Sequence, residues 1–182
     1  MNIITIATNC ENKTRGELGL NKSGHWCAEF ASYVINNSDI NENAKTVTSI
    51  SCTAMQSNMS KSEYWSEPED DIKAGDIIFY NWNHDYDSTG NLDHVGIVVE
   101  VHDDYIITIE GNTVGNCEPT APVKRKTRYR NQLNFNCKYP DYYMRYVDCN
   151  KPTENYNNKV LTDNDFIKEL STLIKKYPEL FS

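Results

Sequence analysis

The chain has 182 residues and a net charge of -8, and 38% of its residues are hydrophobic. This length suits one domain with a substantial core and a short appendage. The negative charge argues against general binding to nucleic acids and against electrostatic docking on anionic membranes, because both depend on surplus lysine and arginine. No apolar run is long enough to cross a bilayer, so we expect no membrane insertion.

The first nine residues contain no basic residue and only a short apolar stretch, unlike a secretory signal. We therefore expect a chain made in the cytoplasm without a signal peptide. The six cysteines form no CxxC pair, which argues against a structural zinc site. If one cysteine is catalytic, an odd number remains, so we expect reduced thiols rather than a complete disulfide framework. No metal and no cofactor are predicted.

Helices are predicted early in the chain and strands later. One helix is predicted from Cys27, where apolar residues recur at helical spacing, to the polar run 36–39. A second, short helix is predicted from near Ser51. Strands rich in β-branched and aromatic residues are predicted at 76–80, 95–101, 105–109, 123–129 and 142–147. This order indicates the α+β class, with N-terminal helices packed on a central antiparallel β-sheet.

The C-terminal part of the chain has a different character. Residues 148–159 are polar and contain Pro152, which is typical of a linker. A capping signal at 162–165 then precedes apolar residues on one helical face, which predicts an amphipathic helix. We expect a domain at 1–147 and an appendage at 148–182, whose helix lies on the domain or binds a partner.

Cys27 occupies the first turn of its predicted helix. There, unpaired amide groups and the helix dipole favour the thiolate over the thiol. A thiolate is the form of cysteine that attacks an amide. A cysteine by itself is more often a small buried hydrophobe, so this interpretation depends on a base and an orienting group elsewhere in the chain.

His94 is the candidate base among the four histidines. It opens a predicted strand whose alternate apolar residues face the core, so His94 shares the other face with Gly96. Because Gly96 has no side chain, we expect the helix of Cys27 to approach that face closely. Either Glu110, which ends the next strand, or Asn112 can then orient the imidazole if the two strands are neighbours.

Four motifs in chain order resemble the CHAP family, the cysteine, histidine-dependent amidohydrolases and peptidases. They are WCAEF at 26–30, AGDIIFY at 74–80, DHVGIV at 93–98 and IEGN at 109–112, within a match that covers about 14–146. The resemblance implies a papain-like α+β fold and cleavage of amide bonds in peptidoglycan. It also implies a catalytic Cys–His–Glu/Asn site, carried here by Cys27, His94, Glu110 and Asn112.

On this basis we expect a peptidoglycan hydrolase, an amidase or endopeptidase that cuts the stem peptide or cross-bridge through a thioester. Bacterial peptidoglycan is the expected partner of a monomeric protein that acts at the cell wall, as a phage lysin or an excised wall-degrading module. Two alternatives are a catalytically silent wall-binding module on the same fold and a thiol amidase that acts on a small-molecule amide.

Four further residues are candidates for binding the substrate. Trp26, Tyr80 and Trp82 are predicted to line the cleft with aromatic surface. Asn21 is predicted to supply a second oxyanion donor beside the backbone amide of Cys27.

Two polar runs are given structural rather than functional interpretations. Asp85, Asp87, Asn91 and Asp93 have the spacing of the first part of an EF-hand loop, but the position of its bidentate glutamate is Gly96. An Asx-rich surface turn is therefore favoured over a calcium site. The basic run 124–130 places alternate cations on one strand face, which favours a charged sheet face over an anion-binding site.

Overall fold

The structure is a computed structural model that describes eight stretches of the chain. They are residues 1–21, 24–40, 42–61, 72–81, 92–114, 120–129, 135–136 and 144–148. The chain divides into two compact units, Met1–Lys151 and Pro152–Ser182. All described residues belong to the first unit. The predicted C-terminal helix therefore lies outside them, and the domain boundary at residue 147 stays a prediction.

Four helices are described, namely α1 (Ile3–Asn9), α2 (Cys27–Asn37), α3 (Glu42–Lys45) and α4 (Cys52–Ser60). The two predicted helices, α2 and α4, are confirmed, whereas α1 and α3 were not predicted. Capping explains two of the starts: Asn2 accepts a hydrogen bond from the Thr5 amide at 2.8 Å, and Ser51 accepts one from the Ala54 amide at 3.3 Å. In the described part of the chain, no helix has the length and apolar character that a membrane crossing requires.

The strands form one mixed sheet in the order β4-β3-β2-β1-β6-β5. Their bounds are β1 (Ile77–Asn81), β2 (His94–Val101), β3 (Tyr105–Glu110), β4 (Lys124–Tyr129), β5 (Phe135–Asn136) and β6 (Met144–Asp148). The central run from β4 to β1 is antiparallel, as predicted. On its other side β1 pairs in parallel with β6, and the short edge strand β5, which was not predicted, pairs antiparallel with β6.

The two faces of the sheet carry different clusters of buried residues. Helices α1, α2 and α4 pack with alternate residues of β1, β2 and β3, among them Val95 and Ile97, in the larger hydrophobic cluster. A smaller cluster on the other face includes Tyr80 and Val98. Because side chains alternate along a strand, His94 and Gly96 share the face of Val98, as predicted.

Two glycines, Gly96 and Gly111, leave room for the side chains of neighbouring residues. A Cβ atom on Gly96 would lie 2.9 Å from Glu110 Cγ, so the Glu110 side chain fills the space above Gly96. The sequence had predicted that the helix of Cys27 would fill this space, and that prediction is wrong. Helix α2 makes its close approach at Gly111 instead. A Cβ atom there would lie 2.7 Å from Trp26 Cζ3 and 2.8 Å from Phe30 Cβ.

We predict that Gly111→Ala destabilises the fold by about 1–3 kcal/mol, because the buried side chains of Trp26 and Phe30 cannot make room without strain. Gly16→Ala is the matched control, since a Cβ atom at Gly16 meets nothing within 4 Å. Urea unfolding of both variants measures the effect. Equal stability of Gly111→Ala and wild type would contradict the close approach of α2.

Candidate active site

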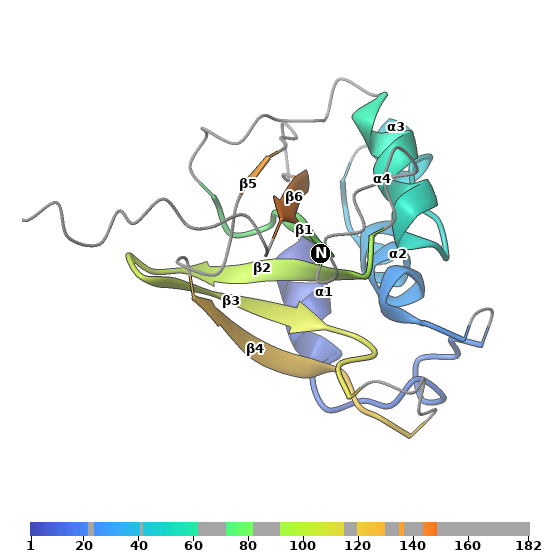
Figure 1. Cartoon of the computed structure of the whole chain (residues 1–182). Helices are drawn as coiled ribbons and strands as arrows, with labels where there is room; N and C mark the ends of the chain where they lie inside the picture. The colour runs from blue at the N-terminus through green and yellow to red at the C-terminus, as the bar shows by residue number, and fades with distance from the viewer. Residues whose placement is uncertain are drawn as a thin grey trace, which may run out of the picture. The chain divides into compact units, whose positions relative to one another are not determined.

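Three candidate residues lie at the ends of three elements that meet at one end of the strands. Cys27 is the first residue of α2, His94 the first of β2 and Glu110 the last of β3. The antiparallel register, with Ile97 opposite Ile109, brings the start of β2 beside the end of β3. Figure 1 shows the start of β2 and the end of β3 at the end of the sheet that is nearest to α2, and α2 contacts both strands.

His94 and Glu110 form a buried hydrogen-bonded pair. His94 Nε2 lies 2.9 Å from Glu110 Oε2, and both side chains are buried. This contact occupies Nε2 and leaves Nδ1 of the ring for Cys27, which is near enough to raise the pKa of His94. The imidazole is therefore held between a sulfur atom and a carboxylate, in the arrangement that a cysteine nucleophile requires.

The Glu110 carboxylate accepts hydrogen bonds from three further side chains. Thr108 Oγ1 donates to Oε1 at 2.6 Å and Tyr80 Oη donates to Oε1 at 3.3 Å, while Arg128 Nε donates to Oε1 at 2.9 Å and Arg128 Nη2 donates to Oε2. Burial alone would raise the pKa of Glu110, but His94 and Arg128 outweigh it and lower the pKa to about 2. Glu110 is thus an anion under all ordinary conditions.

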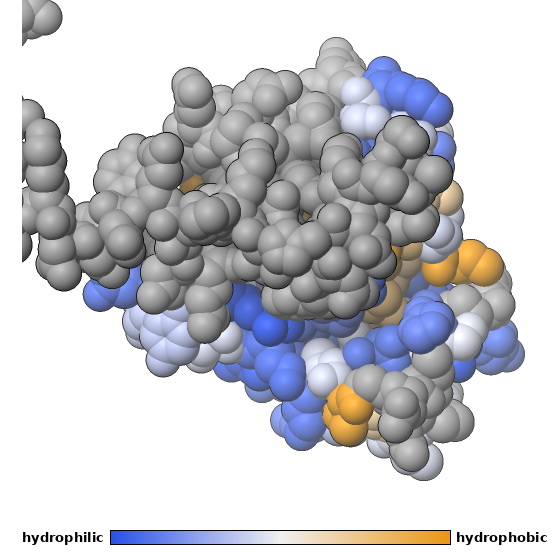
Figure 2. Space-filling view, viewed as in Figure 1, coloured by the Kyte–Doolittle hydropathy of each residue, from blue (hydrophilic) through white to orange (hydrophobic). Residues whose placement is uncertain are grey.

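Arg128 belongs to the basic run that the sequence had assigned to a charged sheet face. Lys124, Lys126 and Arg128 do share one face of β4, but this face is half-buried, whereas the alternate residues are exposed. Figure 2 shows mostly hydrophilic residues on the described surface along β4. Arg128 differs from a solvated surface cation because its guanidinium grips Glu110 in a bidentate manner and lies 5.0 Å from the centre of the Tyr80 ring.

Two aromatic residues predicted to line the cleft are buried instead. Trp26 and Tyr80 both have 0% exposure, so neither can contact a substrate. Trp26 packs edge-on against Phe30, with ring centres 6.4 Å apart, where α2 approaches β3. Tyr80 lies opposite His94 in the sheet and stacks on its ring at 5.7 Å, which restricts the orientation of the imidazole.

The electrostatics of the site favour a charged pair of Cys27 and His94. A hydrogen bond with Cys52 is the largest cause that lowers the pKa of Cys27, to about 4, while burial opposes the shift and His94 adds to it. Burial would lower the pKa of His94, but hydrogen bonds and negative charge from Cys27 and Glu110 raise it to about 9. At neutral pH the pair is therefore a thiolate and an imidazolium.

Cys52 is a residue of the site that the sequence did not assign. It is the first residue of α4, and its Sγ atom lies 3.4 Å from Sγ of Cys27. The hydrogen bond with Cys27, followed by burial, raises the pKa of Cys52 well above its ordinary value. Cys52 therefore remains a thiol and donates its proton to the Cys27 thiolate. No pattern in the sequence relates these two cysteines, because only the packing of α4 beside α2 brings them together.

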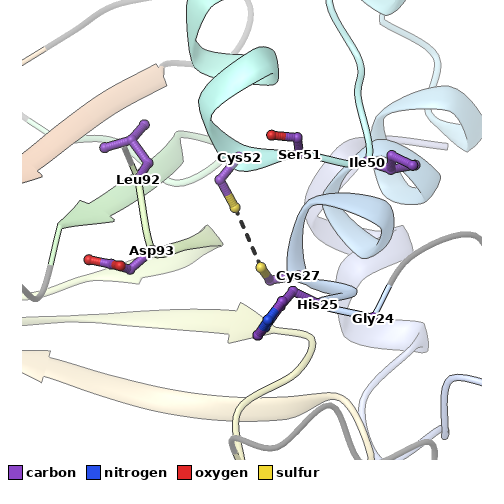
Figure 3. Close-up of a pocket in the computed structure, with 8 residues that line it drawn as sticks. All are labelled: Gly24, His25, Cys27, Ile50, Ser51, Cys52, Leu92 and Asp93. Carbon is purple, nitrogen blue, oxygen red and sulfur yellow. Dashed lines mark hydrogen bonds between the residues drawn. The ribbon is translucent and has the colours of Figure 1, made fainter. Parts of the chain in front are cut away.

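Both sulfur atoms face a pocket of about 400 Å³. Figure 3 shows the two side chains pointing toward one another between the starts of α2 and α4. The pocket is lined by Gly24, His25, Cys27, Ile50, Ser51, Cys52, Leu92 and Asp93. The amide of Leu92 donates to Thr53 Oγ1 at 3.1 Å, which fastens α4 to the segment that enters β2.

The structure separates the two candidates for orienting His94. Glu110 makes the contact, whereas Asn112 is held in the left-handed region at φ 58° with its Oδ1 atom buried and without a hydrogen-bond partner among the described residues. Asn21 is not among the residues that line the pocket, and its backbone amide donates to Glu29 Oε1 at 2.9 Å. The role of Asn21 as an oxyanion donor therefore stays a prediction.

Some predicted residues lie outside the described part of the chain. They are Trp82 and three residues of the weighed calcium site, Asp85, Asp87 and Asn91. The fourth, Asp93, lines the pocket. Within the described stretches, no group of three or more His, Cys, Asp or Glu side chains is arranged to hold a metal ion.

Comparison with known proteins agrees with this geometry. The family model of the CHAP domain matches residues 19–112, a span that includes Cys27, His94 and Glu110. No curated protein and no solved structure matches the chain. The α+β fold and the matched span together show that the chain belongs to the CHAP family, whose members are amidases and peptidases that act on peptidoglycan.

Proposed function

We propose that the protein hydrolyses an amide bond of the peptidoglycan stem peptide or cross-bridge through a thioester on Cys27. The observation that carries this proposal is the buried hydrogen-bonded line from His94 through Glu110 to Arg128, with Cys27 near enough to His94 for each to shift the pKa of the other. It supplies a thiolate, a proton donor and a fixed negative charge behind that donor, beside an open pocket. Such a set is suited to acyl transfer.

In the proposed reaction, the Cys27 thiolate attacks the carbonyl carbon of the amide and a C–S bond forms. Imidazolium His94 donates its Nδ1 proton to the nitrogen atom as the C–N bond breaks, and the amine leaves. The neutral imidazole then takes a proton from water, which attacks the thioester and releases the carboxylic acid and the thiolate. Thus His94 acts first as an acid and then as a base.

The backbone at the start of α2 supports the negative oxygen atom of the intermediate. The first amides of a helix have no partner within it, and Trp26, which precedes α2, makes no side-chain cap. We assign the oxyanion to the backbone amide of Cys27, next to the sulfur that attacks. Since this donor is part of the helix, it is already in place before the reaction.

Cys27→Ala should abolish the loss of turbidity of purified cell walls, because the thioester can no longer form. Cys10→Ala is the matched control, since Cys10 is a buried free thiol that does not line the pocket. Turbidity is followed over time, and mass spectrometry of the digest locates the new amino termini and hence the amide that is cut. Equal lysis by wild type and Cys27→Ala would reject the mechanism.

The same digest separates the alternatives. Binding to walls without new amino termini would indicate a silent wall-binding module. Intact walls combined with rapid thiol-dependent cleavage of a small-molecule amide would indicate an amidase with another substrate. Activity on peptidoglycan places the protein at the bacterial cell wall, in the setting of a phage lysin or of a wall-degrading module.

Arg128 is proposed as a positioning residue that acts through Glu110. In Arg128→Gln the buried Glu110 loses its cation and its pKa rises; we expect it to pass the pKa of about 4 of Cys27, so the acid limb of the pH–activity profile moves to higher pH. We also expect kcat to fall by about 10- to 100-fold, since a hydrogen bond to a charged group contributes about 1.5–3 kcal/mol. The pH dependence of wall hydrolysis measures both effects.

Two variants make this test specific. Arg128→Lys keeps the charge without the bidentate grip, and it should restore the acid limb with only part of the rate. Arg125→Gln removes a cation of the same strand that pairs with Glu11 and Glu100, and it should leave the profile unchanged. An unshifted acid limb in Arg128→Gln would show that Arg128 has only a structural role.

A further inference from the structure

Two helices begin with a cysteine at the same place in the fold. Cys27 starts α2 and Cys52 starts α4, and the two helices are in contact. Their Sγ atoms are 3.4 Å apart and form one wall of the pocket, as Figure 3 shows. The hydrolytic mechanism uses only the sulfur of Cys27 as a nucleophile. It therefore gives no chemical role to the Cys52 thiol, which lies in contact with that sulfur.

The separation of the two sulfur atoms is close to that of a disulfide. An S–S bond measures about 2.05 Å, so the atoms, which are 3.4 Å apart, need to approach by about 1.4 Å. The residues just before Cys52, Ile50 and Ser51, are exposed and give the start of α4 room to adjust. Neither thiol is in a disulfide in the structure, and both line the same pocket of about 400 Å³.

We propose that Cys27 and Cys52 form a reversible oxidation site, in which a peroxide oxidises Cys27 and Cys52 resolves the product as a disulfide. The inference needs a reactive Cys27 but does not depend on the identity of the amide substrate. The disulfide blocks the nucleophile, so the site switches activity off in the presence of peroxide and on again when a thiol reductant is present. It also prevents the irreversible steps of cysteine oxidation.

The two steps balance as follows. The Cys27 thiolate attacks one oxygen atom of hydrogen peroxide, an S–O bond forms, the O–O bond breaks, and hydroxide takes a proton from His94 to leave as water. The Cys52 sulfur then attacks the sulfenic sulfur, an S–S bond forms, the S–O bond breaks, and the Cys52 proton leaves with the hydroxide as a second water. Sulfur is oxidised and peroxide is reduced in equal measure.

The surroundings favour the second step once the first has occurred. The negative charge and hydrogen bond of Cys27 are major causes of the raised pKa of Cys52, alongside burial and the charge of Asp93. Conversion of Cys27 to its neutral sulfenic acid removes the contribution of Cys27. The Cys52 thiol then ionises more readily, beside the sulfur that it has to attack.

Tryptic mapping of the full chain tests this proposal. Reduced protein is treated with equimolar hydrogen peroxide, free thiols are alkylated, and the digest is examined for a link between peptides 23–45 and 46–61, each of which contains one cysteine. We expect this linked pair, together with loss of alkylation at Cys27 that dithiothreitol reverses. Absence of the linked pair in oxidised wild type would overturn the proposal.

Cys52→Ser distinguishes a resolving thiol from a bystander, because serine keeps a hydrogen-bond donor for Cys27 but cannot form a disulfide. When this variant receives at least two equivalents of peroxide, one for the sulfenic acid and one for the sulfinic acid, peptide 23–45 should gain about 32 Da, and dithiothreitol should not restore alkylation. Cys10→Ser should behave as wild type. Full recovery of Cys52→Ser would reject the resolving role. These readouts do not use cell walls, so a chain that forms the disulfide but leaves walls intact would reject only the proposed hydrolysis.

Discussion

The hydrogen bond between His94 Nε2 and Glu110 Oε2 is the contact on which the rest of the site depends. Both groups are buried, and a buried charge is tolerated only when it is paired and hydrogen-bonded. The line Cys27, His94, Glu110 and Arg128 alternates negative and positive charges that sum to zero. Each group keeps its neighbour ionised, and loss of any one would leave an unpaired charge beside it.

The fold brings these groups together because Cys27, His94 and Glu110 each stand at the end of a helix or strand, and these ends lie near one another. Strand register places Tyr80 opposite His94, and Gly96 leaves space for the Glu110 side chain on the same face. Gly111 lets Trp26 and Phe30 approach the end of β3, and this approach of α2 brings Cys27 near the imidazole of His94. Small residues at two positions thus set the geometry of charged groups elsewhere.

Local patterns in the sequence are sufficient for part of the site. Helical spacing after Cys27 marks the start of α2, and strand alternation places His94 and Glu110 on one face, so their meeting can be anticipated. These patterns concern neighbours along the chain. They could not separate Glu110 from Asn112, because the turn after β3 decides which side chain reaches the imidazole.

Contacts between distant elements could not be anticipated in this way. Arg128 stands opposite Ile106 in the register of β3 with β4 and reaches Glu110 along the shared sheet face, and Cys52 reaches Cys27 only through the packing of α4. The same limit explains the error at Trp26: its place beside Cys27 in the chain suggested a cleft, yet its side chain turns into the core against Gly111. Sequence motifs thus identify the reacting groups, whereas tertiary packing supplies the groups that tune them.

The ionic state of the pair is the central claim, and NMR of the two ring nitrogen atoms of His94 measures it directly. We predict that both nitrogen atoms carry protons at neutral pH and that the ring deprotonates near the raised pKa of about 9. In Cys27→Ala the pKa of His94 should fall, because the thiolate that supports the imidazolium is gone. A neutral imidazole in wild type at neutral pH would contradict the account.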